Sequence, residues 1–150
     1  MKAKSTHNSN GIGRPWLALC LCLTVHVAEE AFTGFLPFYS DATRAVSEIF
    51  PYVTSPSLVL AASMWMSVAF VAMLTALTPF AYRGAGWMRV ATIGVALIAL
   101  ANVSGHIGGS MLVGSALPGV YTTPLLAVSG VYALVSAWRW NPGDVESRAA

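Results

Sequence analysis

The sequence predicts an all-α membrane protein, a bundle of four transmembrane helices whose N and C termini both lie in the cytoplasm. Of its 150 residues, 56% are hydrophobic and only 9% are charged, and the mean hydropathy is +0.66. Soluble domains carry about 25% charged residues, so this deficit indicates an integral membrane protein. Four apolar segments, each near the ~20 residues that a helix needs to cross the hydrocarbon core, predict the number of helices. Backbone polar groups must pair within each segment in lipid, and the alternating pattern of barrel strands is absent.

The expected elements follow one another along the chain, and the loop between the first two helices, at about 39–56, is long for so small a protein. Residues 1–15 are polar and basic and are expected to form a disordered cytoplasmic tail. A helical domain covers 16–140, and residues 141–150 form a polar C-terminal tail that starts with a Pro-Gly break. The four helices are expected at about 16–37, 57–80, 88–112 and 119–139.

Three local features qualify this outline. In the loop after the first helix, Ala42 to Phe50 has helical spacing and is expected to be either a short amphipathic helix or an exposed loop. Pro124 is expected to kink the last helix one turn inside its start. Cys20 and Cys22 lie two residues apart on a helix, point to nearly opposite sides and serve as packing residues.

The first apolar segment has an alternative interpretation as a signal peptide. A basic start precedes an apolar core from Trp16 to Val25, which is the usual order in such peptides. Against this, Glu29 and Glu30 occupy the region where cleavage would occur, and the apolar character resumes at Ala31. A retained transmembrane helix is therefore favoured.

The positively charged residues predict the orientation of the bundle. Seven of the eight Lys and Arg residues lie at one end of it, and only Arg44 lies at the other. The seven are Lys2, Lys4, Arg14, Arg83, Arg89, Arg139 and Arg148. This bias predicts that both termini lie on the cytoplasmic side of the membrane. The net charge of only +2, without a basic cluster, excludes nucleic acid as a partner and leaves the bilayer as the expected one, with an oligomer left open.

The strongest indication of function is the run His26-Val27-Ala28-Glu29-Glu30 inside the first apolar segment. An ionised group at this depth costs roughly 3 kcal/mol or more, and crossing a membrane does not require one. His26 and Glu30 are one helical turn apart and share a face. Glu29 and Glu30 diverge by about 100°, so only one of them is expected to face the bundle centre.

A second polar pair, Asn102 and His106, lies one turn apart on the third predicted helix. At about 1.5 Å per residue, His26 and Glu30 lie roughly 16 and 22 Å from the cytoplasmic end of their helix. Asn102 and His106 lie roughly 21 and 27 Å from the same end of theirs. Trp65 on the second predicted helix and Tyr121, Thr122 and Thr123 on the fourth fall in the same outer half of the bundle. All four helices are therefore expected to contribute to one site there.

Three kinds of chemistry fit these residues. His26, Glu30 and His106 would hold one divalent metal such as zinc and leave a position open for water or substrate. Alternatively, a buried glutamate and a histidine would exchange protons without a metal. In the third interpretation, the groups form a structural hydrogen-bonded network between helices. Sequence spacing does not separate the first two.

The leading functional hypothesis is a membrane enzyme that acts on a lipophilic small molecule. His26, Glu29 or Glu30, and His106 would carry the chemistry. The substrate would be bound by Asn102, Trp65, Tyr121 and Thr122. The alternatives are a module that binds or transports a metal ion or a proton, and a structural partner subunit of a membrane complex.

The order of these motifs resembles the HXXEE family of small bacterial membrane proteins. The resemblance rests on His26-Val-Ala-Glu29-Glu30, Asn102-x-x-x-His106 and Pro118-Gly119-x-Tyr121-Thr122, and it runs from about Leu17 to Leu134. It implies a small helical membrane fold with a His/Glu site and no particular reaction. One departure is Leu117, where the family has a tyrosine before the Pro-Gly pair. A looser likeness, in chemistry only, is to the emopamil-binding-type sterol isomerases, which use buried His and Glu in a helical membrane fold.

Overall fold

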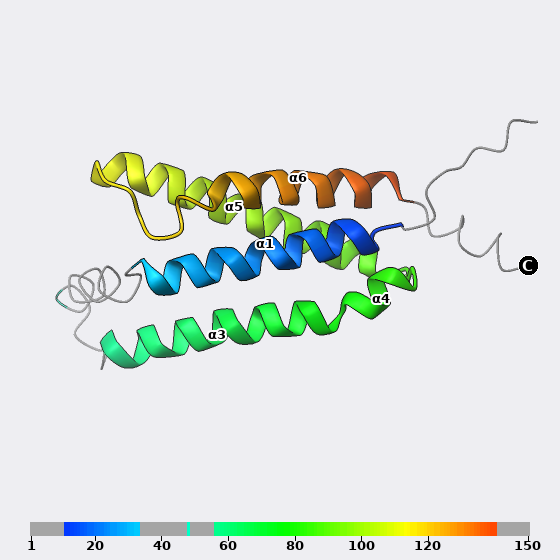
Figure 1. Ribbon diagram of the computed structural model, residues 1–150, viewed down its shortest axis with the longest axis horizontal. Helices are drawn as coiled ribbons and strands as arrows, with labels where there is room; N and C mark the ends of the chain where they lie inside the picture. The colour runs from blue at the N-terminus through cyan, green and yellow to red at the C-terminus, as the bar shows by residue number, and fades with distance from the viewer. Residues whose placement is uncertain (1–10, 34–47, 49–55, 141–150) are drawn as a thin grey trace, which may run out of the picture.

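The computed structural model describes residues 11–33, 48 and 56–140, and the regular secondary structure in this part of the chain is all helical. The helices are α1 (Gly13–Phe32), α3 (Pro56–Ala76), α4 (Thr78–Tyr82), α5 (Met88–Val113) and α6 (Thr123–Arg139). The four long helices lie side by side along one axis (Figure 1). Three helical stretches, Gly13–Phe32, Met64–Tyr82 and Met88–Val113, are long and apolar enough to cross a membrane. The predicted all-helical class is therefore confirmed.

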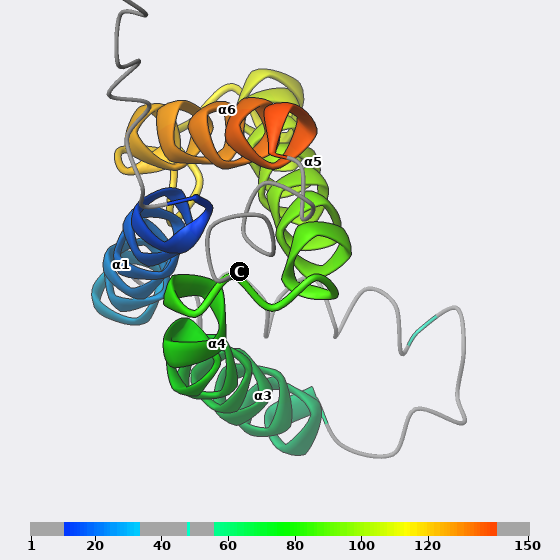
Figure 2. The same cartoon turned by 90° about the vertical axis from the view of Figure 1, so that its right-hand side faces the viewer.

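Helix α1 is the central element of the bundle. It contacts α3 and α4 on one side and α5 and α6 on the other, while α5 and α6 pack against each other, as the end view shows (Figure 2). The indole Nε1 of Trp16 donates a hydrogen bond of 3.1 Å to the carbonyl oxygen of Leu74 and ties α1 to α3. The largest buried apolar side chains are Trp16, Ile12, Leu19, Leu74, Met88 and Leu126.

The start of α1, helix α4 and the end of α6 meet at one end of the molecule (Figure 1). A Cβ atom on Gly13 would lie 2.8 Å from the Tyr82 ring, so only glycine permits this approach of α1 to α4. At the same end, the Arg89 guanidinium donates to the carbonyl oxygens of Ala137 at 3.2 Å and Trp138 at 3.4 Å. It thereby satisfies two of the carbonyls left open at the C-terminus of α6. The connection between α5 and α6, residues 114–122, is called the α5–α6 turn. It lies at the opposite end of the molecule, nearer the polar residues of α1 (Figure 1).

The helix boundaries differ from the expected ones at several places. Helix α1 ends at Phe32 instead of near residue 37, and the helix expected at 57–80 is divided at Leu77 into α3 and α4. Helix α1 begins at Gly13, so residues 13–15 of the expected tail are helical. Helix α6 begins at Thr123, and residues 119–122 form a turn instead of its first residues. The expected kink at Pro124 is wrong, because this proline occupies the first turn of α6, where its missing N–H has no partner to lose. The predicted helix from Ala42 to Phe50 lies outside the described residues, apart from Glu48.

Candidate functional site

Helices α1 and α5 bring two histidines and one glutamate together in what we call the His/Glu cluster: His26, Glu30 and His106. Glu30 Oε1 lies 3.0 Å from His106 Nε2 and 3.7 Å from His26 Nε2. The two imidazole rings meet edge to face, with centroids 4.9 Å apart and an interplanar angle of 87°. His26 is only 2% exposed, so the cluster is screened from its surroundings on the α1 side.

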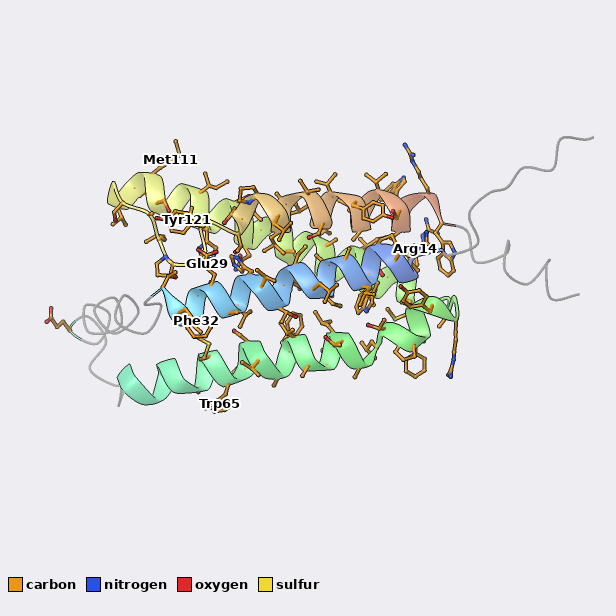
Figure 3. The ribbon with its side chains drawn as sticks, viewed as in Figure 1. Arg14, Glu29, Phe32, Trp65, Met111 and Tyr121 are labelled. Atoms are coloured by element: carbon orange, nitrogen blue, oxygen red, sulfur yellow. The ribbon has the colours of Figure 1, made fainter. Side chains whose placement is uncertain are left out.

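The second glutamate of α1 has a different environment. Glu29 faces the turn before α6, where its Oε1 accepts the backbone N–H of Tyr121 at 3.1 Å and its Oε2 accepts that of Thr122 at 2.7 Å. Figure 3 shows Glu29 directed toward this turn. Thr122 is the N-cap residue of α6, so the carboxylate satisfies open donors at a helix N-terminus, where negative charge is favourable. Both oxygens of Glu29 are therefore engaged away from the cluster.

Thr122 links this turn to the cluster. Its hydroxyl oxygen lies 2.8 Å from Nδ1 of His26 and 3.3 Å from the carbonyl oxygen of Gly119. Thr123 donates a second hydroxyl hydrogen bond, of 3.0 Å, to the same carbonyl. The turn is thus held by side chains from α1 and from the start of α6.

Gly119 lies directly against the His/Glu cluster. A Cβ atom at this position would lie 2.9 Å from Glu30 Cγ, 2.9 Å from His106 Cε1 and 3.0 Å from His26 Cε1. Its φ of +88° is in the left-handed region that favours glycine. The sequence pattern indicated only a helix break at Pro118-Gly119. Such a pair also signals a turn with special backbone geometry.

Two ring nitrogens of the cluster lack a partner. Within the described part of the chain, His26 Nε2 and His106 Nδ1 are buried without a hydrogen bond. Asn102 makes a polar side-chain interaction with His26, but it does not give Nε2 a partner with hydrogen-bond geometry. Leaving a buried polar atom without a hydrogen bond costs about 1–3 kcal/mol. A bound water or ion, or a proton shared with a neighbouring group, would therefore stabilise each of these nitrogens.

Some of the other site residues predicted from the sequence lie at the cluster, and others do not. Thr122 and Asn102 both interact with His26. Tyr121 contributes its backbone N–H, whereas its side chain is 74% exposed. Trp65 is 73% exposed and points away from α1 on the outer side of α3 (Figure 3). The structure does not bring Trp65 to the cluster.

The three residues of the cluster are of types that could hold a metal ion, and their ligand atoms lie close together. One ligand atom each from His26, Glu30 and His106 can be chosen so that all lie within 4.8 Å of one another. Zinc bonds of 2.0–2.2 Å in tetrahedral geometry place ligand atoms roughly 3.3 Å apart. The measured separations of 3.0 and 3.7 Å fall on either side of that value. Two imidazoles and one carboxylate, with a fourth position open, form a common catalytic zinc set.

The fold and the site define a class: a helical protein with membrane-spanning lengths of apolar helix and a buried His/Glu cluster. The chain belongs to the HXXEE family, because its residues 16–133 match the family described as "Protein of unknown function with HXXEE motif". This match confirms the resemblance seen in the sequence motifs. No curated protein and no solved structure matches the chain significantly. In this chain the motif divides into His26 and Glu30, which form the cluster, and Glu29, which holds the turn.

Proposed function

We propose that the chain is an integral protein of the bacterial cytoplasmic membrane that spans it four times with both termini inside. Helix α6, with 17 residues, is roughly 25 Å long and lies at the short end of the range for a span. The arginines at positions 14, 83, 89 and 139 support the orientation, since they lie near the end where α1 starts and α6 finishes.

The His/Glu cluster is proposed to bind one divalent transition metal ion such as zinc. The observation that carries this proposal is His26 Nε2, which is buried and unpaired 3.7 Å from a carboxylate oxygen and beside a second imidazole. A cation held between these atoms would satisfy the nitrogen and the carboxylate at once. A metal bound there supplies Lewis-acid activation of a water or a substrate oxygen.

Elemental analysis of the purified protein tests the metal site. We expect about one metal ion per chain in the wild type, and its loss in His106→Ala, because a site of three protein ligands cannot hold the ion firmly with two. His7→Ala removes the histidine of the polar N-terminal segment and serves as the matched control, which should keep the metal. Equal metal content in wild type and His106→Ala would refute the site.

The substrate is proposed to be a lipophilic small molecule that approaches along α5. Glu30 and His106 are the partly accessible members of the cluster, with side chains 10% and 13% exposed. Next to them α5 exposes Asn102 and Gly105, and a Cβ atom at Gly105 would meet nothing within 4 Å. If α5 spans the bilayer, a molecule reaching this face arrives from the hydrocarbon phase. Asn102, polar and exposed at this depth, would orient the polar group of the substrate.

Filling the open face of α5 tests this approach. Gly105→Leu should reduce by at least about tenfold any change in lipid or isoprenoid profile that the wild type causes in cells, while leaving the metal content intact. Gly94→Leu is the matched control. Gly94 lies eleven residues earlier, on the same face of α5, and is also exposed, and a Cβ atom there would likewise meet nothing within 4 Å. Mass spectrometry of cell extracts gives the comparison, and equal profiles for the two variants would contradict the proposed approach.

A second candidate is a metal-free acid–base pair. The 3.0 Å contact between Glu30 Oε1 and His106 Nε2 is already a good hydrogen bond, so these two groups can share a proton without a metal. In that case the purified wild type carries no stoichiometric metal, yet substitution of Glu30 still removes the change in the lipid profile. The elemental analysis therefore separates the two candidates.

A further inference from the structure

We infer that Glu29 is a positioning residue, which acts through the α5–α6 turn and Thr122 to hold His26 in the tautomer with its proton on Nδ1. The inference rests on the proposed function in one respect, namely that Nε2 of His26 is the atom that binds the cation. The arrangement of hydrogen bonds around the turn is independent of any metal.

The first step is the pair of hydrogen bonds by which Glu29 holds the turn. Its two carboxylate oxygens accept the consecutive backbone N–H groups of Tyr121 and Thr122, at 3.1 and 2.7 Å. Hydrogen bonds to an ionised acceptor are shorter and roughly twice as strong as neutral ones. Glu29 and His26 lie within one helical turn of each other on α1. These two hydrogen bonds therefore fix the position of Thr122 relative to the His26 ring.

The second step is the direction of the hydrogen bonds at Thr122. Its hydroxyl carries one proton and lies 2.8 Å from His26 Nδ1. It also has two neighbours that can only accept, the carbonyl oxygen of Gly119 at 3.3 Å and the carboxylate of Glu29. If the hydroxyl donates to Gly119, its oxygen is free to accept the N–H of Nδ1, and all three groups are satisfied. If it donated to Nδ1 instead, the hydroxyl would lose its hydrogen bond to Gly119, and the Nε2 proton of His26 would face the Glu30 carboxylate at 3.7 Å, beyond hydrogen-bond distance.

The third step is the effect on the cluster. A neutral His26 with its proton on Nδ1 carries its lone pair on Nε2, the atom that faces Glu30 Oε1 at 3.7 Å. Metal-binding histidines generally donate their second ring N–H to a neighbouring acceptor, which fixes tautomer and ring orientation. In this chain that acceptor is Thr122, and Glu29 holds it in place.

Nitrogen NMR of the metal-free full-length protein tests the inference, because protonated and unprotonated imidazole nitrogens have widely separated ¹⁵N shifts. In a His7→Ala background only His26 and His106 remain, and His106→Ala assigns the two. We expect His26 to be protonated on Nδ1 alone in the parent protein and in Thr122→Ser, which keeps the hydroxyl. Thr122→Val and Glu29→Gln should move the proton partly or wholly to Nε2.

The same variants report on cation binding. Thr122→Val and Glu29→Gln should weaken zinc binding by about 10–100-fold, and Thr122→Ser should restore most of it. The inference is overturned if the parent protein carries its His26 proton on Nε2, or if either Thr122→Val or Glu29→Gln leaves the tautomer unchanged. A protein that shows the expected tautomers but binds no zinc would refute the metal site and leave the positioning role standing.

Discussion

Replacing Gly119 with alanine should abolish the proposed metal binding of the His/Glu cluster and destabilise the protein. At φ +88° a residue with a side chain costs about 1–3 kcal/mol of backbone strain. The new methyl group would also lie 2.9–3.0 Å from carbon atoms of all three cluster residues, closer than such contacts allow. We therefore expect metal content to fall by at least about tenfold, with a lower unfolding temperature in detergent, as measured by elemental analysis and thermal unfolding.

The variant Gly114→Ala tests the effect of backbone strain without a close contact to the His/Glu cluster. Gly114 lies in the same connection between α5 and α6 with φ +71°, but a Cβ atom there would meet nothing within 4 Å. This variant should lose a comparable amount of stability from the backbone and keep its metal. If both variants lost metal equally, the loss would come from a weakened turn in general, and the close packing of Gly119 over the cluster would have no special role.

Helix geometry explains why the partners in the cluster could be predicted from the sequence. The rise per residue is constant, so counting from one membrane face places His26, Glu30 and His106 in the same half of the bundle before any contact is known. His26 and Glu30 are four residues apart, about one helical turn, and therefore lie on one face of α1. The structure brings these three residues together.

Other features of the site cannot be predicted from the depth of a residue in the bundle. Trp65 lies in the same half of the bundle, but its position around α3 directs it outward. The choice between Glu29 and Glu30 depends on where the α5–α6 turn returns, and that turn is made by residues about ninety positions later in the chain. The start of α6 was expected too early because the segment from Gly119 to Thr122 is apolar enough to continue a helix, whereas a left-handed glycine interrupts it.

Replacing Glu30 with glutamine should have the largest effect on function with the smallest effect on fold. Glutamine has nearly the same size, so packing between α1 and α5 is retained, while the negative charge beside both imidazoles is lost. The glutamine side chain keeps an oxygen that can accept a hydrogen bond, so the unfolding temperature of the variant should stay close to that of the metal-free wild type. The metal should be lost, and any conversion of a lipophilic substrate should fall by roughly 10²–10⁴-fold, as expected for removal of a group that binds the cation or transfers the proton.

Cells without the gene provide the reference for this experiment, because the substrate is identified only by its class. Lipid and isoprenoid extracts of cells that express Glu30→Gln should match those of cells without the gene, and both should differ from extracts with the wild type. Glu48→Gln, which changes an exposed glutamate outside the five helices in the same way, should behave as the wild type. A wild-type profile for Glu30→Gln at normal expression would mean that the cluster is a structural network between helices, since only such a network tolerates loss of the charge.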